Sequence, residues 1–201
     1  SDPPSPDHWF GATADSDLRN LPRGEVTVGG MPFRLLDAPL DCLAPLPVGD
    51  GTVSIPVGRK AASLRFLHAT HLVPGSEESF FEGFKKGANW LGIPMGAYTI
   101  AYDDGATDRC PILYVSNIRR WEIGEAIPYV FRSVGFLFAA TEKMRQHDPN
   151  ARDICLYVAQ WVNPHPEKVV KSIGVSGCGE AVPVVFAVTG RETKSKEGGN
   201  G

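Results

Sequence analysis

The sequence predicts an all-β protein, a jelly-roll β-sandwich built from two antiparallel sheets. Apolar and polar residues alternate with a period of two in several short runs, as in strands with one buried face. The 201 residues include 22 glycines and 17 prolines, which suits many short strands joined by turns. One turn reads Asp103-Asp104-Gly105, and Asp-Gly is a preferred pair in tight hairpins. These features predict roughly ten strands and less than about a fifth of the residues in helix.

Four strands are predicted in the first half of the chain, at 25–28, 31–37, 52–57 and 63–71. Gly29-Gly30 separates the first two, and a proline-rich loop at 38–51 follows the second. In the fourth strand the even-numbered residues share one face and the odd-numbered residues share the other. We therefore expect His68 in the core with a satisfied hydrogen bond and His71 on the opposite face. Two histidines on opposite faces are poorly placed to bind one metal ion.

The second half begins with a hairpin, whose strand 98–102 returns through Tyr114 and Val115. Further strands are predicted at 129–138, 154–162, 169–175 and 182–188. Asn163-Pro164-His165-Pro166 separates the second of these strands from the third, because two prolines remove two backbone donors and fix two φ angles. This pattern predicts a corner where the chain crosses between sheets, with Ile173 and Val175 on one face of the strand that follows.

Composition limits the partners and the domain organisation. The net charge of −3 argues against nucleic acid or an anionic membrane as a partner, and no apolar run approaches the roughly 18 residues of a membrane span. We interpret 1–18 as a linker-like segment, 19–190 as one β-sandwich module and 191–201 as a linker-like tail. A complete small protein with frayed ends is the alternative. The four cysteines have no zinc-site spacing, and the sequence does not assign their pairing.

No catalytic motif of high specificity is present. Glycoside hydrolysis needs two carboxylates roughly 5–10 Å apart, and the acidic candidates are Asp103, Asp104, Glu122, Glu125 and Glu180. The hairpin turn explains Asp103 and Asp104 better, because short acidic side chains bond to nearby backbone in turns. The glycine-rich stretch 174–179 looks like a phosphate-binding loop, but such a loop must open a helix, and a strand is predicted after it.

Several stretches resemble one family. LPRGEVTVGGMPFRLLD, SIPVGRKAASLRFLHATH, AYTIAYDDGAT followed by SNIRRWE, and WVNPHPEKVVKSI look like parts of galactose-binding-like β-sandwich modules related to the NPCBM type. Such modules accompany bacterial glycoside hydrolases and related polysaccharide-degrading enzymes. The similarity covers about residues 21–188, and PVGRKAASLRFLHA and WVNPHPEK are its most specific phrases.

The resemblance implies a non-catalytic carbohydrate-binding module that targets an attached degrading enzyme to its glycan. The expected partners are a polysaccharide or oligosaccharide and an adjoining catalytic domain, in an extracellular or periplasmic setting. No cofactor is required, and a structural calcium ion is compatible with the family, although the sequence does not identify its ligands. A small glycan hydrolase or lyase, and a structural interdomain sandwich without a sugar site, are the alternatives.

The expected sugar site lies in two irregular segments, 72–96 and 117–127. Each contains a tryptophan beside basic or amide side chains, and sugars stack their apolar faces on aromatic rings. The two segments flank the 98–115 hairpin, so they should meet at the end opposite its turn. The alternative is that both indoles close the core at that end. The predicted ligand-binding residues are Trp90, Asn117, Arg119, Arg120, Trp121 and His71.

Overall fold

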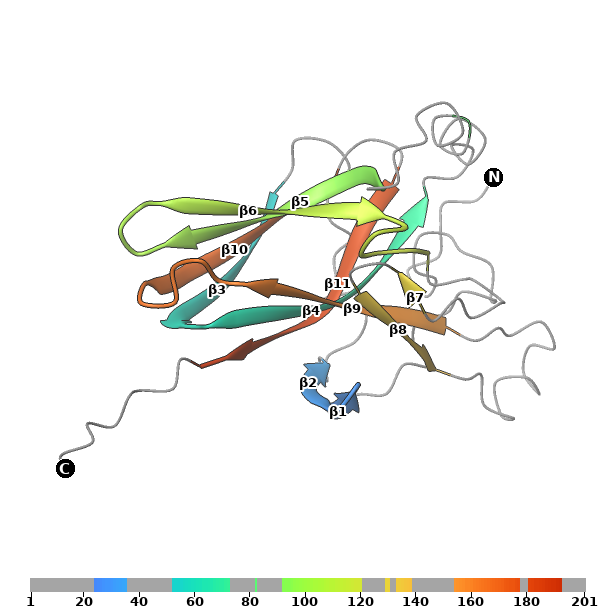
Figure 1. Ribbon diagram of the computed structural model, residues 1–201, viewed down its shortest axis with the longest axis horizontal. Coiled ribbons are helices and arrows are strands. Elements are labelled where there is room, and N and C mark those ends of the chain that lie inside the picture. The colour runs from blue at the N-terminus through green and yellow to red at the C-terminus, as the bar shows by residue number, and fades with distance from the viewer. Residues whose placement is uncertain are drawn as a thin grey trace, which may run out of the picture.

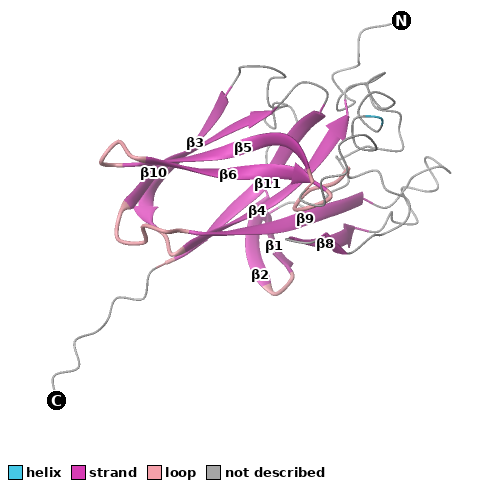
Figure 2. Cartoon of the chain, turned by 45° about the horizontal axis from the view of Figure 1, so that its top comes forward, coloured by secondary structure: helices cyan, strands magenta, loops and turns pink. Residues whose placement is uncertain are grey.

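The protein is all-β in the part of the chain that its computed structural model describes (Figure 2). The described residues are 24–35, 52–72, 82, 92–120, 129–130, 133–138, 154–177 and 181–192. Within them, Glu82 alone has helical geometry, and every sheet pairing is antiparallel. No helix in these ranges is long and apolar enough to cross a membrane.

The strands form three sheets. A two-stranded sheet consists of β1 (Gly24–Val28) and β2 (Met31–Leu35). The four-stranded sheet has the order β3 (Thr52–Lys60), β10 (Val169–Gly177), β5 (Ile93–Tyr102) and β6 (Thr107–Tyr114). The five-stranded sheet has the order β11 (Ala181–Arg191), β4 (Ser63–Leu72), β9 (Ile154–Val162), β8 (Ser133–Phe138) and β7 (Tyr129–Val130). The strand predicted at 129–138 is therefore divided into two.

The four- and five-stranded sheets share one buried core. Leu64 and Phe66 of β4 pack in one cluster with Tyr98 of β5 and with Ile173 and Val175 of β10. The rings of Phe66 and Tyr98 stack with their centroids 3.8 Å apart and their planes at 8°. The period of two predicted in β4 and β10 is confirmed by these inward-facing residues.

A second core lies on the outer face of the five-stranded sheet, which the sequence did not predict. The β1–β2 hairpin packs there, below the larger sheets in Figure 1. Phe33 of β2 clusters with Leu67 and Ala69 of β4 and with Phe186 of β11. Because the odd-numbered face of β4 is also apolar, a two-layer arrangement would leave it in water. The third, two-stranded sheet covers it.

The predicted corner at Asn163-Pro164-His165-Pro166 is confirmed. It joins β9 of the five-stranded sheet to β10 of the four-stranded sheet, and the β3–β4 connection crosses between the same two sheets. These two corners and the β5–β6 hairpin turn lie at one end of the molecule (Figure 1), which we call the turn end. The Asp103 N–H donates to the Val169 carbonyl there, with N and O 3.1 Å apart.

Glycine is required at one position within the four-stranded sheet. Gly96 has φ +149°, and a Cβ atom there would overlap the carbonyl oxygen of Ser176 on the neighbouring β10. The β5–β6 register shifts between Pro94 and Gly96, as in a bulge. Only a residue without a side chain allows the two backbones to approach so closely at this point.

Candidate functional site

An open cleft lies along the seam between β3 and β11. These strands are the outer strands of the two facing sheets, so no sheet hydrogen bonds join them in the described chain. The cleft has a volume of about 410 Å³, within the range of roughly 300–1,000 Å³ common for small-molecule sites. Its lining comprises Ile55, Pro56, Val57, Arg59, Lys60, Ala61, Leu64, Ile173, Val188, Thr189, Gly190 and Glu192.

The floor of the cleft is aliphatic. Leu64 and Ile173 are buried, and Ile55, Val57 and Val188 are half-buried where they pack against the same core. Their partial exposure follows from the open seam, because no described strand continues either sheet beyond β3 or β11. The floor therefore offers an apolar surface that a ligand can remove from water.

The cleft is open partly because β11 has a glycine opposite Leu64. A Cβ atom at Gly190 would lie 3.6 Å from Leu64 Cδ2 and 3.7 Å from Ala61 Cβ, which are ordinary contact distances. The backbone at Gly190 thus accepts a side chain. A large side chain at this position would occupy cleft volume, which makes Gly190 a useful position for testing the site.

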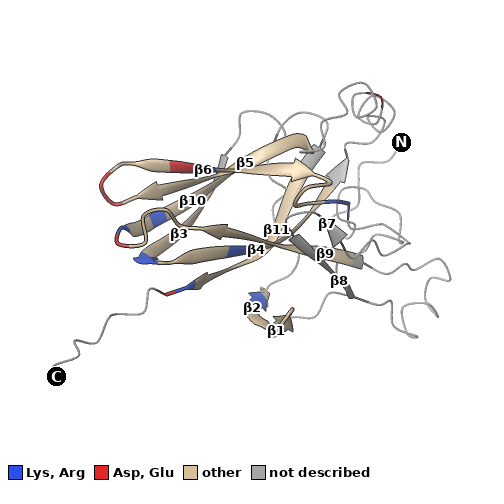
Figure 3. Ribbon diagram, viewed as in Figure 1, with Lys and Arg blue, Asp and Glu red and all other residues tan. Residues whose placement is uncertain are grey.

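The rim of the cleft carries both hydrogen-bond donors and acceptors. Arg59 and Lys60, at the end of β3, are exposed and can only donate. Glu192, just beyond β11, is exposed and its carboxylate only accepts, whereas the Thr189 hydroxyl does both. Charged segments of the larger sheets gather toward this turn end (Figure 3). A ligand with several hydroxyl groups needs both kinds of partner beside an apolar surface.

Asn163 fixes the corner that frames the cleft. Its Nδ2 donates to the Ala61 carbonyl at 2.7 Å, and its backbone N–H donates to the Ala62 carbonyl at 3.0 Å. Its Oδ1 accepts the His165 N–H at 2.8 Å, which is the side-chain-to-backbone bond of an Asx-turn. The Ala62 N–H in turn donates to the Arg191 carbonyl at 2.7 Å. One buried amide therefore holds the β3–β4 and β9–β10 corners together.

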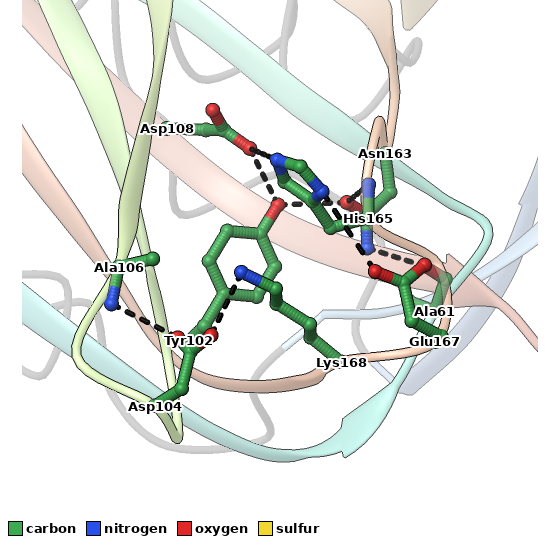
Figure 4. Close-up of polar contacts among 9 residues, drawn as sticks. All are labelled: Ala61, Tyr102, Asp104, Ala106, Asp108, Asn163, His165, Glu167 and Lys168. Atoms are coloured by element: carbon green, nitrogen blue, oxygen red, sulfur yellow. Dashed lines mark hydrogen bonds and ion pairs between the residues drawn. The ribbon is translucent and has the colours of Figure 1, made fainter.

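Tyr102 extends this network to the β5–β6 hairpin (Figure 4). Its hydroxyl oxygen lies 2.7 Å from Asp108 Oδ2 and 2.7 Å from Asn163 Oδ1. Asn163 Oδ1 already accepts from His165, so the single hydroxyl proton is shared between two acceptors. Burial, with the Asp108 carboxylate as the next cause, raises the pKa of Tyr102 far above its usual value. The hydroxyl therefore stays protonated, and it links Asp108 of β6 to Asn163 of the β9–β10 corner.

Charged side chains close the network on its exposed side. Lys168 Nζ lies 2.7 Å from Asp104 Oδ2 and 5.4 Å from the centroid of the Tyr102 ring. The Lys168 ammonium and the Ala106 N–H lower the pKa of Asp104, and the same contact raises the pKa of Lys168. The predicted turn role of Asp104 is thus confirmed. The ring nitrogens of His165 lie 3.9 Å from Asp108 and 3.8 Å from Glu167.

His68 has the core position that the sequence predicts. It is fully buried, with Nδ1 2.6 Å from the Tyr98 hydroxyl and Nε2 2.8 Å from the Asn117 carbonyl. Since a carbonyl only accepts, Nε2 carries the proton and Nδ1 accepts from Tyr98. Burial lowers the pKa of His68 to about 4, against a smaller opposing effect of the bond to Asn117. His68 is therefore a neutral, structural imidazole.

The predicted site residues that the structure describes, which are Asn117, Arg119, Arg120 and the backbone of His71, lie at the end opposite the turns. The start of β5 pairs with the end of β6, Ile93 opposite Tyr114, so the segments flanking this hairpin leave it at that end. Arg119 and Arg120 are half-buried beside the end of β4, where the Thr70 N–H donates to the Arg119 carbonyl at 3.0 Å. The backbone of His71 follows directly in β4.

Asn117, in contrast, has its side chain engaged within the turn after β6. Its Oδ1 accepts the Leu113 N–H at 2.8 Å, and its Nδ2 donates to the Pro111 carbonyl at 2.9 Å. The structure thus gives this buried amide a backbone-fixing role. Trp90 and Trp121 lie outside the described residues, as do the carboxylates Glu122, Glu125 and Glu180. The prediction that these tryptophans line a sugar site stays a prediction.

The described residues hold no group of three or more His, Cys, Asp or Glu side chains that could bind a metal ion. The compatibility with a structural calcium ion stays an expectation. The residues 174–179 do not open a helix in the described part of the chain: β10 continues through Gly177, and the strand β11 begins at Ala181.

Searches with the whole sequence against protein-family models and against curated proteins found no match.

Sequence reasoning missed the cleft because its lining comes mostly from regular strands. The prediction placed ligand residues in irregular segments, where binding residues often concentrate. Two signals were present in the sequence: a glycine, Gly190, within the last strand, and adjacent cations, Arg59 and Lys60, before two alanines. Neither identifies a cleft until the pairing places β3 and β11 at the same open edge.

Proposed function

We propose that the protein is a non-catalytic carbohydrate-binding module with a jelly-roll, galactose-binding-like fold. It binds a polysaccharide or oligosaccharide and directs an attached degrading enzyme to that glycan in an extracellular or periplasmic setting. The resemblance of residues 21–188 to such modules supports this proposal. So does the way the chain alternates between the facing sheets at the β3–β4 and β9–β10 corners.

The cleft between β3 and β11 is the observation that carries the proposal. A sugar ring has an apolar C–H face and a set of hydroxyl groups that both donate and accept. The cleft offers an aliphatic floor, including Leu64 and Val188, beside the donors Arg59 and Lys60 and the acceptor Glu192. Compact binding sites usually combine these two kinds of surface. Most of these residues lie on strands of the two antiparallel sheets.

A binding role suits the described carboxylates better than hydrolysis does. Asp104 is paired with Lys168, and Asp108 accepts a hydrogen bond from the buried Tyr102 hydroxyl. Both groups join the turns of the molecule, and neither lines the cleft. The hydrolase or lyase alternative would therefore need acidic residues from other parts of the chain.

The experiment is affinity gel electrophoresis in a panel of soluble polysaccharides, comparing the parent with Gly190→Phe and Gly190→Ala. We expect the phenylalanine to fill the cleft and abolish retardation, and the alanine to leave it nearly unchanged. Thermal melts of both variants control for folding. Retardation of Gly190→Phe equal to that of the parent would exclude the cleft as the sugar site.

Two further arms of the same screen test the other proposals. Trp90→Ala and Trp121→Ala examine the second candidate site, formed with His71, Arg119 and Arg120. Loss of binding in these variants at unchanged melting temperature would move the site there. Turnover of any polysaccharide by the parent would favour the enzyme alternative, and absence of binding to the whole panel would favour the structural interdomain alternative.

A further inference from the structure

We infer that the cleft selects anionic saccharides, with the carboxylate of a uronic acid bound by Arg59 and attracted by the neighbouring charge of Lys60. This inference rests on the proposed function and names the ligand class of the same cleft. It starts from the charges of the lining residues. Arg59 and Lys60 contribute two positive charges, and Glu192 contributes one negative charge. The lining therefore carries a net positive charge in a protein whose overall net charge is −3.

Within the part of the chain that the structure describes, the two cations at the cleft are available to a ligand. Two other basic side chains at the turn end have partners: Lys168 pairs with Asp104, and Arg65 Nε donates to Gln160 at 3.2 Å. Arg59 and Lys60 form no ion pair or side-chain hydrogen bond with any described residue. Adjacent uncompensated cations at a binding surface favour an anionic ligand and disfavour a cationic one.

The positions of the charges also set the orientation of the ligand. Arg59 and Lys60 lie at the end of β3, whereas Glu192 lies just beyond β11 on the other side of the seam. A ring resting on the aliphatic floor would direct its carboxylate toward the β3 side. Its hydroxyl groups would donate to Glu192 on the β11 side. The reverse orientation would place two carboxylates together, which is unfavourable.

The test compares tetragalacturonate with its methyl ester by titration calorimetry. The ester keeps the ring, hydroxyl groups and length of the ligand but removes its charge. We expect the parent to bind the acid roughly tenfold more tightly than the ester, since each exposed ion pair contributes a factor of up to about five. The preference should shrink as salt increases, because exposed charges are screened. The double variant Arg59→Gln/Lys60→Gln should lose it.

Arg109→Gln is the matched control, because Arg109 is exposed on β6 at the opposite edge of the four-stranded sheet. It should keep the preference for the acid. A sulfated disaccharide, included as a further probe, separates general anion binding from carboxylate selection. If it competes as strongly as the acid, the specificity for uronic acids is wrong.

The outcomes separate the two proposals. Equal binding of acid and ester, abolished by Gly190→Phe, would overturn the anion preference and leave the glycan-binding function standing. A preference for the acid that survives in Arg59→Gln/Lys60→Gln would assign the anion to other residues and overturn the inference. If the parent binds no glycan in either form or in the wider panel, the proposed function itself fails.

Discussion

At the scale of single residues, the buried histidine determines a pH response. His68 is enclosed between the facing sheets, where its neutral ring accepts from Tyr98 and donates to Asn117. Its pKa is lowered to about 4 from an ordinary value of 6.5. The folded protein therefore resists protonation in a pH range where the unfolded chain takes up a proton.

This difference predicts that stability falls as the solution is acidified. Above the unfolded pKa of 6.5 both states are neutral at this residue, so the contribution is constant. As pH falls from there toward about 4, the unfolded state gains a proton that the folded state does not. Between about pH 7.5 and pH 5 this lowers the free energy of unfolding by about 2 kcal/mol.

Urea denaturation of the parent and of His68→Gln at both pH values measures the effect. Glutamine cannot titrate, so the variant should lack this part of the acid destabilisation, even if it is less stable at neutral pH. The carboxylates titrate equally in both proteins and cancel in the comparison. Identical pH dependence in parent and variant would show that His68 does not titrate between the two states.

At the scale of structural elements, the β9–β10 corner depends on one side chain. Asn163 is buried, and its side-chain amide forms hydrogen bonds with Ala61, His165 and Tyr102. Asn163→Ala should lower the free energy of unfolding by about 3 kcal/mol, because it leaves buried polar groups without partners. Gln160→Ala, three residues before Asn163 and at an exposed position, should cost less than about 1 kcal/mol.

The same substitution should weaken the cleft. The Asn163 side chain donates to the Ala61 carbonyl, and the Ala62 N–H donates to the Arg191 carbonyl, which lies between Gly190 and Glu192 in the chain. Asn163→Ala should therefore reduce glycan affinity as well as stability, when both are measured well below the melting temperature. Full affinity in a destabilised variant would mean that the corner stabilises the fold without shaping the site.

The edge strands show a second feature at this scale. Each outer strand of the larger sheets that has more than two residues contains a proline: Pro56 in β3, Pro111 in β6 and Pro183 in β11. The Pro111 carbonyl bonds the Asn117 side chain, so this residue's backbone faces away from β5. A proline at a free edge removes the N–H group that another strand would use for pairing.

We predict that restoring this donor promotes association. Pro111→Thr keeps a residue suited to a strand and adds one N–H group at the edge. Size-exclusion chromatography with light scattering should show concentration-dependent association of the variant beyond that of the parent. Thr107→Val, in the same strand, leaves the backbone donors unchanged and should behave as the parent. Equal behaviour of all three proteins would show that Pro111 does not protect the edge.

At the scale of the whole molecule, the sequence predicted what depends on local pattern. The alternation at Ile173 and Val175, the hairpin turn at Asp104 and the inward position of His68 follow from periodicity and turn chemistry. The corner at Asn163 follows from its two neighbouring prolines. Each of these was predicted because neighbours in the chain determine it.

What the sequence could not predict depends on contacts between distant residues. The cleft exists because β3 and β11, separated by more than half of the chain, end as outer strands on the same side. The third sheet exists because Phe33 packs in one cluster with Leu67 and with Phe186, which is still farther away in the chain than β3 is from β11. An apolar residue in a short strand indicates that it is buried, but not which face buries it.

The β1–β2 hairpin should therefore be part of the cooperative fold, although a two-stranded sheet of this length is marginal alone. Phe33 is 2% exposed and seals the outer face of the five-stranded sheet. Phe33→Ala should lower the free energy of unfolding by about 3–5 kcal/mol, because it removes buried apolar surface and leaves a cavity. Thr27→Ala, at an exposed position of β1, should change it by less than about 1 kcal/mol.

Urea denaturation of the two variants measures both values, with binding of an apolar dye as a second readout. If Phe33→Ala unfolds at the parent's urea concentration but binds dye, the hairpin detaches as a separate unit, and the larger sheets are stable without the layer that covers them.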